Sequence, residues 1–310
     1  MALVRAHFRH RMKISSYFRP AVLAVAALAA LALNAAPIPA ESRIGGFAIG
    51  CQAYSFNRFS VFEAIEKTAE AGGKIIEFYP GQILTKEERN IKWTHDASDE
   101  VIARVKEKLA KHNVRAVNYG VVGIPKDEAG ARKIFEFAKK MALYGVTTES
   151  VDNLDLIEKL VKEFDIRVGI HQHAKRFKKE RDAQGNQVED PSYKVWSPEY
   201  IRDQVAKRDP RIGACADLGH WQTSGLKAIE CLKILEGRII SVHMKERAAL
   251  GTGQHDTIFG TGITDMAGVL AELKRQKFTG NLSIEYEYNW DNSVPDIKQC
   301  IDFVRAWKGK

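Results

Sequence analysis

The chain has 310 residues, of which 45% are hydrophobic and 28% are charged, a composition typical of a globular protein with a sizeable core. Its formal net charge is +8, but five basic residues before position 41 have no acidic counterpart, so most of the excess lies there. No later segment combines clustered Lys and Arg with interleaved aromatic residues, and we therefore expect no nucleic-acid partner.

Residues 1–40 have the layout of a secretory signal peptide. A basic stretch precedes an apolar run over 21–33, and small and turn-forming residues follow it. The apolar run is too short to span a bilayer, so we expect cleavage after Ala36 or Ala40 and no stable membrane anchor. The mature domain, residues 41–310, is then expected to be periplasmic or secreted.

After the signal, short apolar runs alternate with amphipathic segments of helical spacing. The predicted strands are 47–52, 75–78, 114–118, 146–148, 168–170, 212–216, 239–242 and 282–284. The predicted helices are 61–71, 98–112, 126–143, 154–164, 197–207, 226–235, 265–276 and 294–307. Strict alternation implies a parallel sheet, and eight strand–helix pairs are the number that closes into a barrel. We predict an α/β fold, a single-domain (β/α)8 TIM barrel, with a doubly wound open sheet as the alternative.

Several helix starts carry capping residues. Ser98 and Asp265 precede segments of helical periodicity and are predicted N-caps, and Ser197 is a predicted N-cap with Pro198 at the first helical position.

Two connections are too long to be simple turns. They run over 174–196 and 246–262, and both follow predicted strands. Loops of this length are usually functional, and these two are expected over the catalytic face of the barrel.

Metal-competent side chains follow the later predicted strands. Asp217, His243 and Glu285 each come directly after an apolar run, and Glu149 and His171 follow two earlier strands. In a barrel of this kind, the chemistry lies at the carboxyl ends of the strands. A set of carboxylates and imidazoles suits Mn²⁺, Mg²⁺, Co²⁺ or Zn²⁺, whereas the four scattered cysteines give no thiolate site.

Each of these residues also has a structural interpretation. Glu149 alone could be a surface carboxylate, and His220 could cap the following helix. His243 could be a core histidine, and His171 with His173 could form a structural pair. Asp217 is harder to dismiss, because a buried ionisable group must be paired or bound. Independent structural explanations at so many consecutive strand ends would be a coincidence.

The motifs at the strand ends resemble those of a known family. They are Val-Gly-Ile-His171-Gln-His173, Asp217-Leu-Gly-His220, Ser-Val-His243-Met-Lys245-Glu-Arg247, Phe259-Gly-Thr-Gly262 and Leu-Ser-Ile-Glu285. As a set, from about Phe47 to the C-terminus, they resemble the xylose isomerase-like barrel superfamily, that is, the sugar phosphate isomerase/epimerase group.

The resemblance implies a divalent metal ion held by Glu, Asp, His and Glu. It assigns Asp217, His243 and Glu285 as ligands. The ketose epimerases of the superfamily supply the fourth ligand, a Glu, from strand five, where this chain has His171. We favour Glu149 as the fourth ligand, with His171 or His173 as the second choice.

The resemblance also implies roles for the neighbouring residues. Glu149, Glu285, His220 and Lys245 are the predicted catalytic residues. The predicted substrate contacts are His171, His173, Arg247 and Tyr79.

The predicted activity is that of a metal-dependent sugar isomerase or epimerase, which removes a proton next to a sugar carbonyl. Export and the lack of a phosphate-binding loop favour a neutral sugar or keto-sugar. A hydrolase or lyase of 3-keto-glycosides is the alternative within the same family, and an exported, non-catalytic sugar-binding barrel is the other. The endonuclease IV branch is disfavoured, because Tyr79 and Tyr119 stand where it needs histidines. The sequence leaves open whether the protein forms a homo-oligomer.

Overall fold

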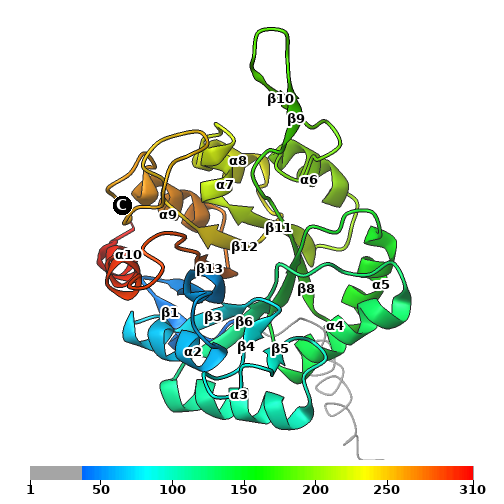
Figure 1. Ribbon diagram of the computed structural model, residues 1–310, viewed down its shortest axis with the longest axis vertical. Helices are drawn as coiled ribbons and strands as arrows, with labels where there is room; N and C mark the ends of the chain where they lie inside the picture. Colours follow the sequence, from blue (N-terminus) through cyan, green and yellow to red (C-terminus); the bar gives the residue numbers. More distant parts are fainter. Residues whose placement is uncertain (1–36, 310) are drawn as a thin grey trace, which may run out of the picture. The chain divides into compact units, whose positions relative to one another are not determined.

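A computed structural model describes residues 37–309, and within them eight parallel strands close into a barrel (Figure 1). In chain order these are β2 (Phe47–Gln52), β3 (Ile75–Phe78), β6 (Arg115–Tyr119), β7 (Gly145–Thr148), β8 (Arg167–His171), β11 (Ile212–Asp217), β12 (Ile239–Met244) and β13 (Asn281–Ile284). Each pairs with the next, and β13 pairs with β2, which closes the barrel. The predicted barrel is confirmed and the open sheet is excluded.

Helices surround the barrel (Figure 1). They are α2 (Val61–Glu70), α3 (Asp99–His112), α4 (Glu128–Lys140), α5 (Leu154–Phe164), α6 (Pro198–Val205), α7 (Leu218–Thr223), α8 (Ala228–Ile234), α9 (Met266–Arg275) and α10 (Val294–Ala306). The predicted caps are confirmed: Ser98, Ser197 and Asp265 each accept a backbone hydrogen bond at their helix start. The short helix α7 was not predicted, because it begins directly at the end of β11.

A small hydrophobic cluster lies apart from the main core. Its members come mainly from barrel strands and are Ile38, Ala48, Ile75, Val117, Tyr144 and Ile240. Ile38, which precedes the first strand, is only 3% exposed, and its carbonyl accepts a hydrogen bond from the guanidinium of Arg43. The chain just before the barrel therefore contributes to its packing.

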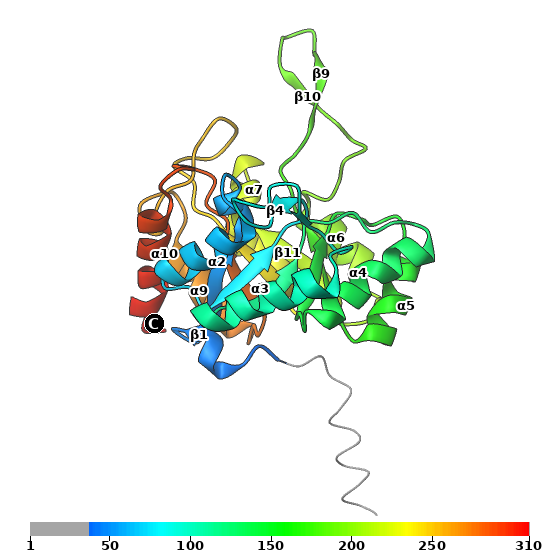
Figure 2. The same cartoon turned by 60° about the horizontal axis from the view of Figure 1, so that its bottom comes forward.

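Of the two long loops, one contains a β-hairpin and the other is almost without secondary structure. The loop over 174–196 contains a hairpin of β9 (Phe177–Arg181) and β10 (Gln187–Glu189), which was not predicted and projects away from the barrel (Figures 1 and 2). Gly185 has a φ of 82°, a value that favours glycine, and lies in its turn. The loop over 246–262 is irregular, apart from a bridge between Arg247 and Asp256.

Three further short strands lie outside the eight barrel strands: β1 precedes the barrel, and β4 and β5 follow its second strand. β1 (Arg43–Ile44) pairs antiparallel with β2, and β4 (Gln82–Ile83) pairs with β5 (Lys92–Trp93). The four cysteines are buried free thiols.

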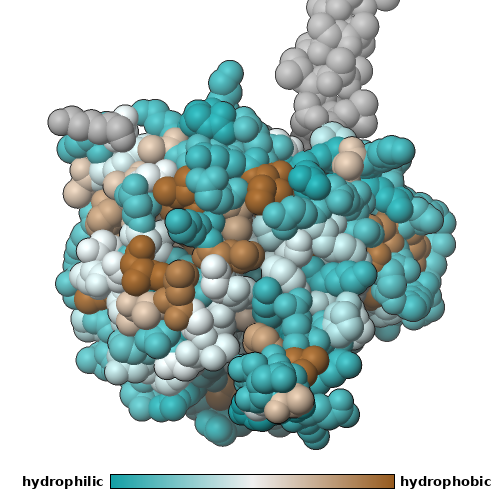
Figure 3. Space-filling model, turned by 90° about the horizontal axis from the view of Figure 1, so that it is seen from above, coloured by the Kyte–Doolittle hydropathy of each residue, from teal (hydrophilic) through white to brown (hydrophobic). Residues whose placement is uncertain are grey.

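The predicted signal peptide lies outside the described residues, apart from positions 37–40. In the part of the chain that is described, no helix has both the length and the hydropathy needed to cross a bilayer. On the side seen in Figure 3, hydrophilic residues cover most of the surface and hydrophobic residues form separate patches.

Candidate metal centre

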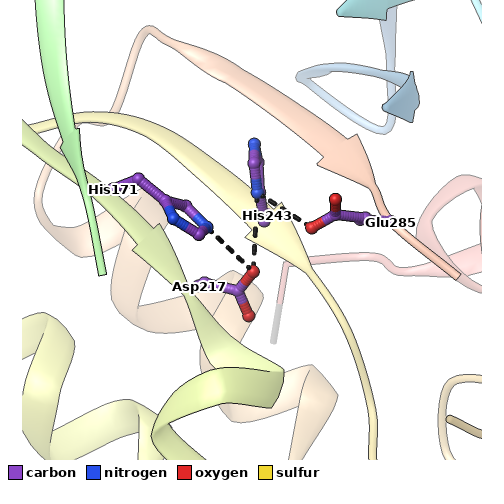
Figure 4. A group of neighbouring side chains, drawn as sticks. All are labelled: His171, Asp217, His243 and Glu285. Atoms are coloured by element: carbon purple, nitrogen blue, oxygen red, sulfur yellow. Dashed lines mark ion pairs between the residues drawn. The ribbon is translucent and has the colours of Figure 1, made fainter. Parts of the chain in front are cut away.

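Four side chains from neighbouring barrel strands meet inside the barrel at the carboxyl ends of these strands (Figure 4). They are His171 of β8, Asp217 of β11, His243 of β12 and Glu285 directly after β13, and one donor atom from each lies within 4.8 Å of the others. The Oδ2 atom of Asp217 is 3.5 Å from Nε2 of His171 and 3.5 Å from Nδ1 of His243. The same Nδ1 is 3.1 Å from Oε2 of Glu285.

Strand register brings these residues together. Asp217 and His243 are direct partners in the parallel ladder of β11 and β12, and His171 pairs with Cys215 on the other side of β11. Residues two apart on a strand point to the same face, so His171 and Asp217 both reach the interior. The sequence thus builds the cluster from neighbouring strands that each contribute one donor.

The two carboxylate oxygens of Asp217 have different surroundings: Oδ1 caps a helix and Oδ2 faces the cluster. Its Oδ1 accepts the backbone N–H of His220 at 2.9 Å and so caps helix α7. Its Oδ2 is buried and, among the described residues, accepts no well-formed hydrogen bond. Of the two alternatives for His220, the structure places its side chain in the lining of the cavity, whereas the N-cap of α7 is Asp217 and His220 lies within the helix.

The donor atoms fit a divalent cation. Besides Oδ2 of Asp217, Nε2 of His171 and Nδ1 of His243 are buried and lack a well-formed hydrogen bond within the described chain. Buried polar atoms almost always have hydrogen-bond partners, whereas these three lie at ion-pair distances from one another, as the ligands of a cation do. Two imidazole nitrogens and two carboxylates suit Mn²⁺, Co²⁺ or Zn²⁺. His171, Asp217, His243 and Glu285 could therefore hold such an ion.

The ammonium group of Lys245 lies in contact with the carboxylates of the same cluster. It is 2.9 Å from Glu285, 3.3 Å from Asp217 and 2.6 Å from Glu287. Gly219 makes room for it, because a Cβ at that position would lie 2.7 Å from the Lys245 side chain. Burial lowers the pKa of Lys245, but the three carboxylates outweigh it and raise the pKa well above its usual value. Lys245 is therefore protonated and compensates part of the negative charge of the cluster.

The buried carboxylate of Glu77 contacts the Nε2 atom of His243. Oε1 of Glu77 is 3.2 Å from Nε2 of His243, on the side of the ring away from Asp217. Glu77 is fully buried and accepts hydrogen bonds from Thr147 and Ser283, each at 2.8 Å. A carboxylate in this position favours a proton on Nε2 and leaves Nδ1 free as a ligand.

Glu149 lies outside the group of four. Its Oε1 is 3.3 Å from Nδ1 of His171, and its Oε2 accepts the hydroxyl of Tyr193 at 2.8 Å. Burial raises the pKa of Glu149, but its interactions with His171 prevail and hold the pKa below its usual range. Burial lowers the pKa of His171, but its interactions with the carboxylates of Asp217 and Glu149 raise the pKa to about 9. The assignment of Glu149 as a ligand stays a prediction.

The cluster opens into a cavity of about 310 Å³. The residues that line it are Gln52, Tyr54, Tyr79, Pro80, Val121, Glu149, His171, His173, His220, Glu285 and Glu287. The rings of His173 and His220 lie 4.0 Å apart, and burial lowers the pKa of both, which favours their neutral forms at neutral pH.

The second half of the chain has the sequence pattern of a known barrel family. The model of the xylose isomerase-like TIM barrel family matches residues 145–307, just over half of the chain. The chain belongs to the xylose isomerase-like TIM barrel family. The matched region supplies all four members of the cluster and Glu149. No match was found among curated protein sequences.

Solved structures of sugar phosphate isomerase/epimerase family members share this fold. A protein of uncharacterised function from Parabacteroides distasonis is 27% identical, with a TM-score of 0.64 over 84% of this chain and 98% of its own. A D-tagatose 3-epimerase-like protein is 18% identical, with a TM-score of 0.60 over 83% and 96% of the two chains. D-allulose 3-epimerase from Methylomonas sp., in complex with D-allulose, is 16% identical, with a TM-score of 0.58 over 84% and 96%.

In this xylose isomerase-like barrel, one predicted substrate contact lies away from the cavity. The guanidinium of Arg247 pairs with Asp256 at 2.8 Å and donates to the carbonyl of Gln254, and Arg247 is not among the described residues that line the cavity. The predicted contacts Tyr79, His171 and His173 do line it.

Sequence reasoning gave no role to several residues that the structure brings to the site. Glu77 lies one residue before the end of β3, and Glu287 shares strand parity with Glu285, which was the available signal for it. Tyr54 follows β2 and lines the cavity, but nothing in its local sequence distinguishes it from a surface tyrosine.

Proposed function

We propose that the protein is a metal-dependent isomerase or epimerase of a neutral sugar or keto-sugar, which acts by removing a proton next to the carbonyl. The observation that carries this proposal is the buried cluster of two imidazoles and two carboxylates at the end of the cavity. The epimerases among the similar structures, one of them bound to D-allulose, support the same substrate class.

His171, Asp217, His243 and Glu285 are the proposed ligands, with His171 rather than Glu149 as the fourth. A divalent cation bound there supplies Lewis-acid polarisation of a sugar carbonyl. The contact of Glu77 with His243 supports this ligand set, since it leaves Nδ1 of His243 available.

Glu149 is the proposed general base. It follows the fourth strand of the barrel, and Glu285 and Glu287 follow the eighth, so the two groups of carboxylates approach the cavity from opposite sides. The interactions with His171 keep the Glu149 carboxylate ionised at neutral pH, as a base must be. A proton taken by Glu149 from one face of a sugar carbon can be replaced from the other face.

Glu287 is the proposed proton donor on that other face. Burial, aided by the charge of Glu285, raises the pKa of Glu287 despite the ammonium of Lys245. Two carboxyl groups of unequal proton affinity, one on each side of the cavity, are the arrangement that two-sided proton transfer needs. The neutral imidazole of His220 is placed to hydrogen-bond a substrate hydroxyl.

The lining of the cavity supports an uncharged substrate. None of the described residues that line it is Lys or Arg, and a phosphate group is usually held by such cations. A neutral sugar also agrees with the proposed export of the protein to the periplasm or the medium.

Cleavage of a 3-keto-glycoside is the second candidate. It begins with the same proton removal, and then the bond to the leaving group breaks and that oxygen takes up a proton. The raised pKa of Glu287 favours this candidate too, because a carboxylic acid at that position can protonate the departing oxygen.

Proton exchange with solvent tests both activities. The Mn²⁺-loaded protein would be incubated in heavy water with D-fructose, D-tagatose, D-allulose and a methyl 3-keto-glucoside, and the products followed by NMR. Deuterium in an epimerised or isomerised ketose supports the first candidate, and release of methanol supports the second. A protein that carries stoichiometric metal but exchanges no proton in any of these sugars would refute the proposal, with Glu149→Gln as the inactive control.

A further inference from the structure

Three aromatic side chains form a continuous wall at the mouth of the cavity. The ring of Tyr54 meets that of Tyr79 edge-on at 5.3 Å between centroids, and that of Trp290 edge-on at 6.0 Å. Tyr54 and Tyr79 line the same cavity as His171 and Glu285. Tyr54 is 40% exposed, so the wall begins at the candidate metal centre and extends to the surface.

The wall is held in place by hydrogen bonds between two loops. The hydroxyl of Ser55, next to Tyr54, accepts the backbone N–H of Tyr286 at 2.7 Å and donates to the carbonyl of Ile284 at 3.2 Å. Further out, Arg58 and Asp291 form an ion pair at 2.7 Å. Because these contacts fix the loops before a ligand arrives, little ordering free energy is lost on binding.

The wall presents both apolar faces and free hydroxyl groups. Within residues 37–309, the hydroxyls of Tyr54 and Tyr79 have no recorded hydrogen-bond partner. Burial raises the pKa of Tyr79 to about 12, so its hydroxyl stays protonated and can donate at neutral pH. A pyranose ring has apolar C–H faces and hydroxyls at its edge, which match flat aromatic rings that carry hydroxyl groups.

The size of the cavity limits what fits beside the metal centre. Its volume of about 310 Å³ is at the small end of ligand pockets in proteins, which begin at roughly 300 Å³. A single sugar ring at the candidate metal centre therefore leaves the exposed parts of Tyr54 and Trp290 uncovered. Rings that remain exposed next to an occupied site are available to a larger substrate.

We infer that the aromatic wall of Tyr54, Tyr79 and Trp290 binds a second sugar ring, so that a glycoside of the keto-sugar is the preferred substrate over the free monosaccharide. This inference rests on the proposed function, because that function places the first ring at the metal centre. It narrows the preferred substrate to a molecule in which a pyranose is linked to the reacting sugar.

Calorimetric titrations of the Mn²⁺-loaded protein test the inference. The probes are D-fructose and three glycosylated fructoses that differ in linkage: turanose, lactulose and isomaltulose. At least one disaccharide is expected to bind ten-fold or more tightly than D-fructose. In Trp290→Ala, which lies outside the lining of the cavity, this advantage should fall to within two-fold, while the affinity for D-fructose and the metal content stay unchanged.

Phe177→Ala is the matched control, because Phe177 is a similarly exposed aromatic residue that lies on the β9–β10 hairpin, outside the wall. It should keep the full disaccharide preference. The inference is overturned if no disaccharide binds more tightly than D-fructose, or if Trp290→Ala weakens both sugars equally. Failure of the proposed function gives a different result: Asp217→Ala would then leave both metal content and D-fructose affinity unchanged.

Discussion

Glu77→Gln tests how the barrel controls its candidate metal centre. Gln has nearly the same shape as Glu, so the fully buried position 77 stays filled, and the hydroxyls of Thr147 and Ser283 can rotate to suit an amide. The amide cannot offer His243 the negative charge that now lies 3.2 Å from Nε2. The ring then loses the interaction that keeps its proton on Nε2, and Nδ1 becomes a poorer ligand.

The expected loss of metal affinity is 10- to 100-fold, the usual effect of removing a carboxylate behind a ligating histidine. This corresponds to about 1.4 to 2.8 kcal/mol of binding free energy, since each factor of ten is about 1.4 kcal/mol. Competition titrations with a chromogenic chelator would measure the affinities for Mn²⁺ and Zn²⁺, with circular dichroism as a check on the fold.

Glu246→Gln is the matched control for this substitution. Glu246 is also a fully buried carboxylate, but its partners are backbone N–H groups of Gly260 and Thr264 in the loop over 246–262. The metal affinity of the Glu246→Gln variant should equal that of the unmodified protein. Equal affinities for Glu77→Gln and Glu246→Gln would refute the role assigned to Glu77.

Further predictions concern the ligands, pH and the N-terminus. Glu285→Gln should abolish turnover without changing the melting curve of the metal-free protein by more than a few degrees; full activity would remove Glu285 from the site. Asp217→Ala should lower the metal content measured by atomic emission, and a stoichiometric content would show that Asp217 is not a ligand. Because the pKa of His171 is raised to about 9 in the metal-free protein, metal must displace a proton at neutral pH. Apparent affinity should therefore rise with pH up to about 9, and calorimetry in two buffers should detect the released proton at pH 7.5. Without metal, the stabilisation from protonated His171 is complete below its unfolded pKa of about 6.5 and is lost as pH rises through 9. Intact-mass analysis tests the predicted export: it should find cleavage after Ala36, which keeps the buried Ile38, and not after Ala40, which removes it.

Much of the fold could be predicted because its signals are local. Each barrel strand is a short apolar run, and each helix has an apolar face of regular spacing and often a capping residue such as Ser98 or Asp265. The β9–β10 hairpin could not be predicted in this way, since its side chains are almost all exposed and give no alternating pattern. Helix α7 is too short for its periodicity to be recognised.

The site could be predicted only in part, because strand ends indicate which residues face the cavity but not the distances between them. The sequence placed Asp217, His243 and Glu285 at strand ends, and it favoured Glu149 over His171 as the fourth ligand. That choice depends on distances between side chains of neighbouring strands, and in the structure His171, not Glu149, lies within the group of four. The position of Arg247 depends on Asp256, which an irregular loop brings back to it.

The presence of one cation held by four neighbouring strands is most directly tested by diffraction from crystals grown with Mn²⁺. We predict an anomalous peak within bonding distance of Nε2 of His171, Oδ2 of Asp217, Nδ1 of His243 and a carboxylate oxygen of Glu285. A peak bound by Glu149 in place of His171 would correct the ligand set. The absence of any peak between these four side chains, in crystals that contain the metal, would contradict the account.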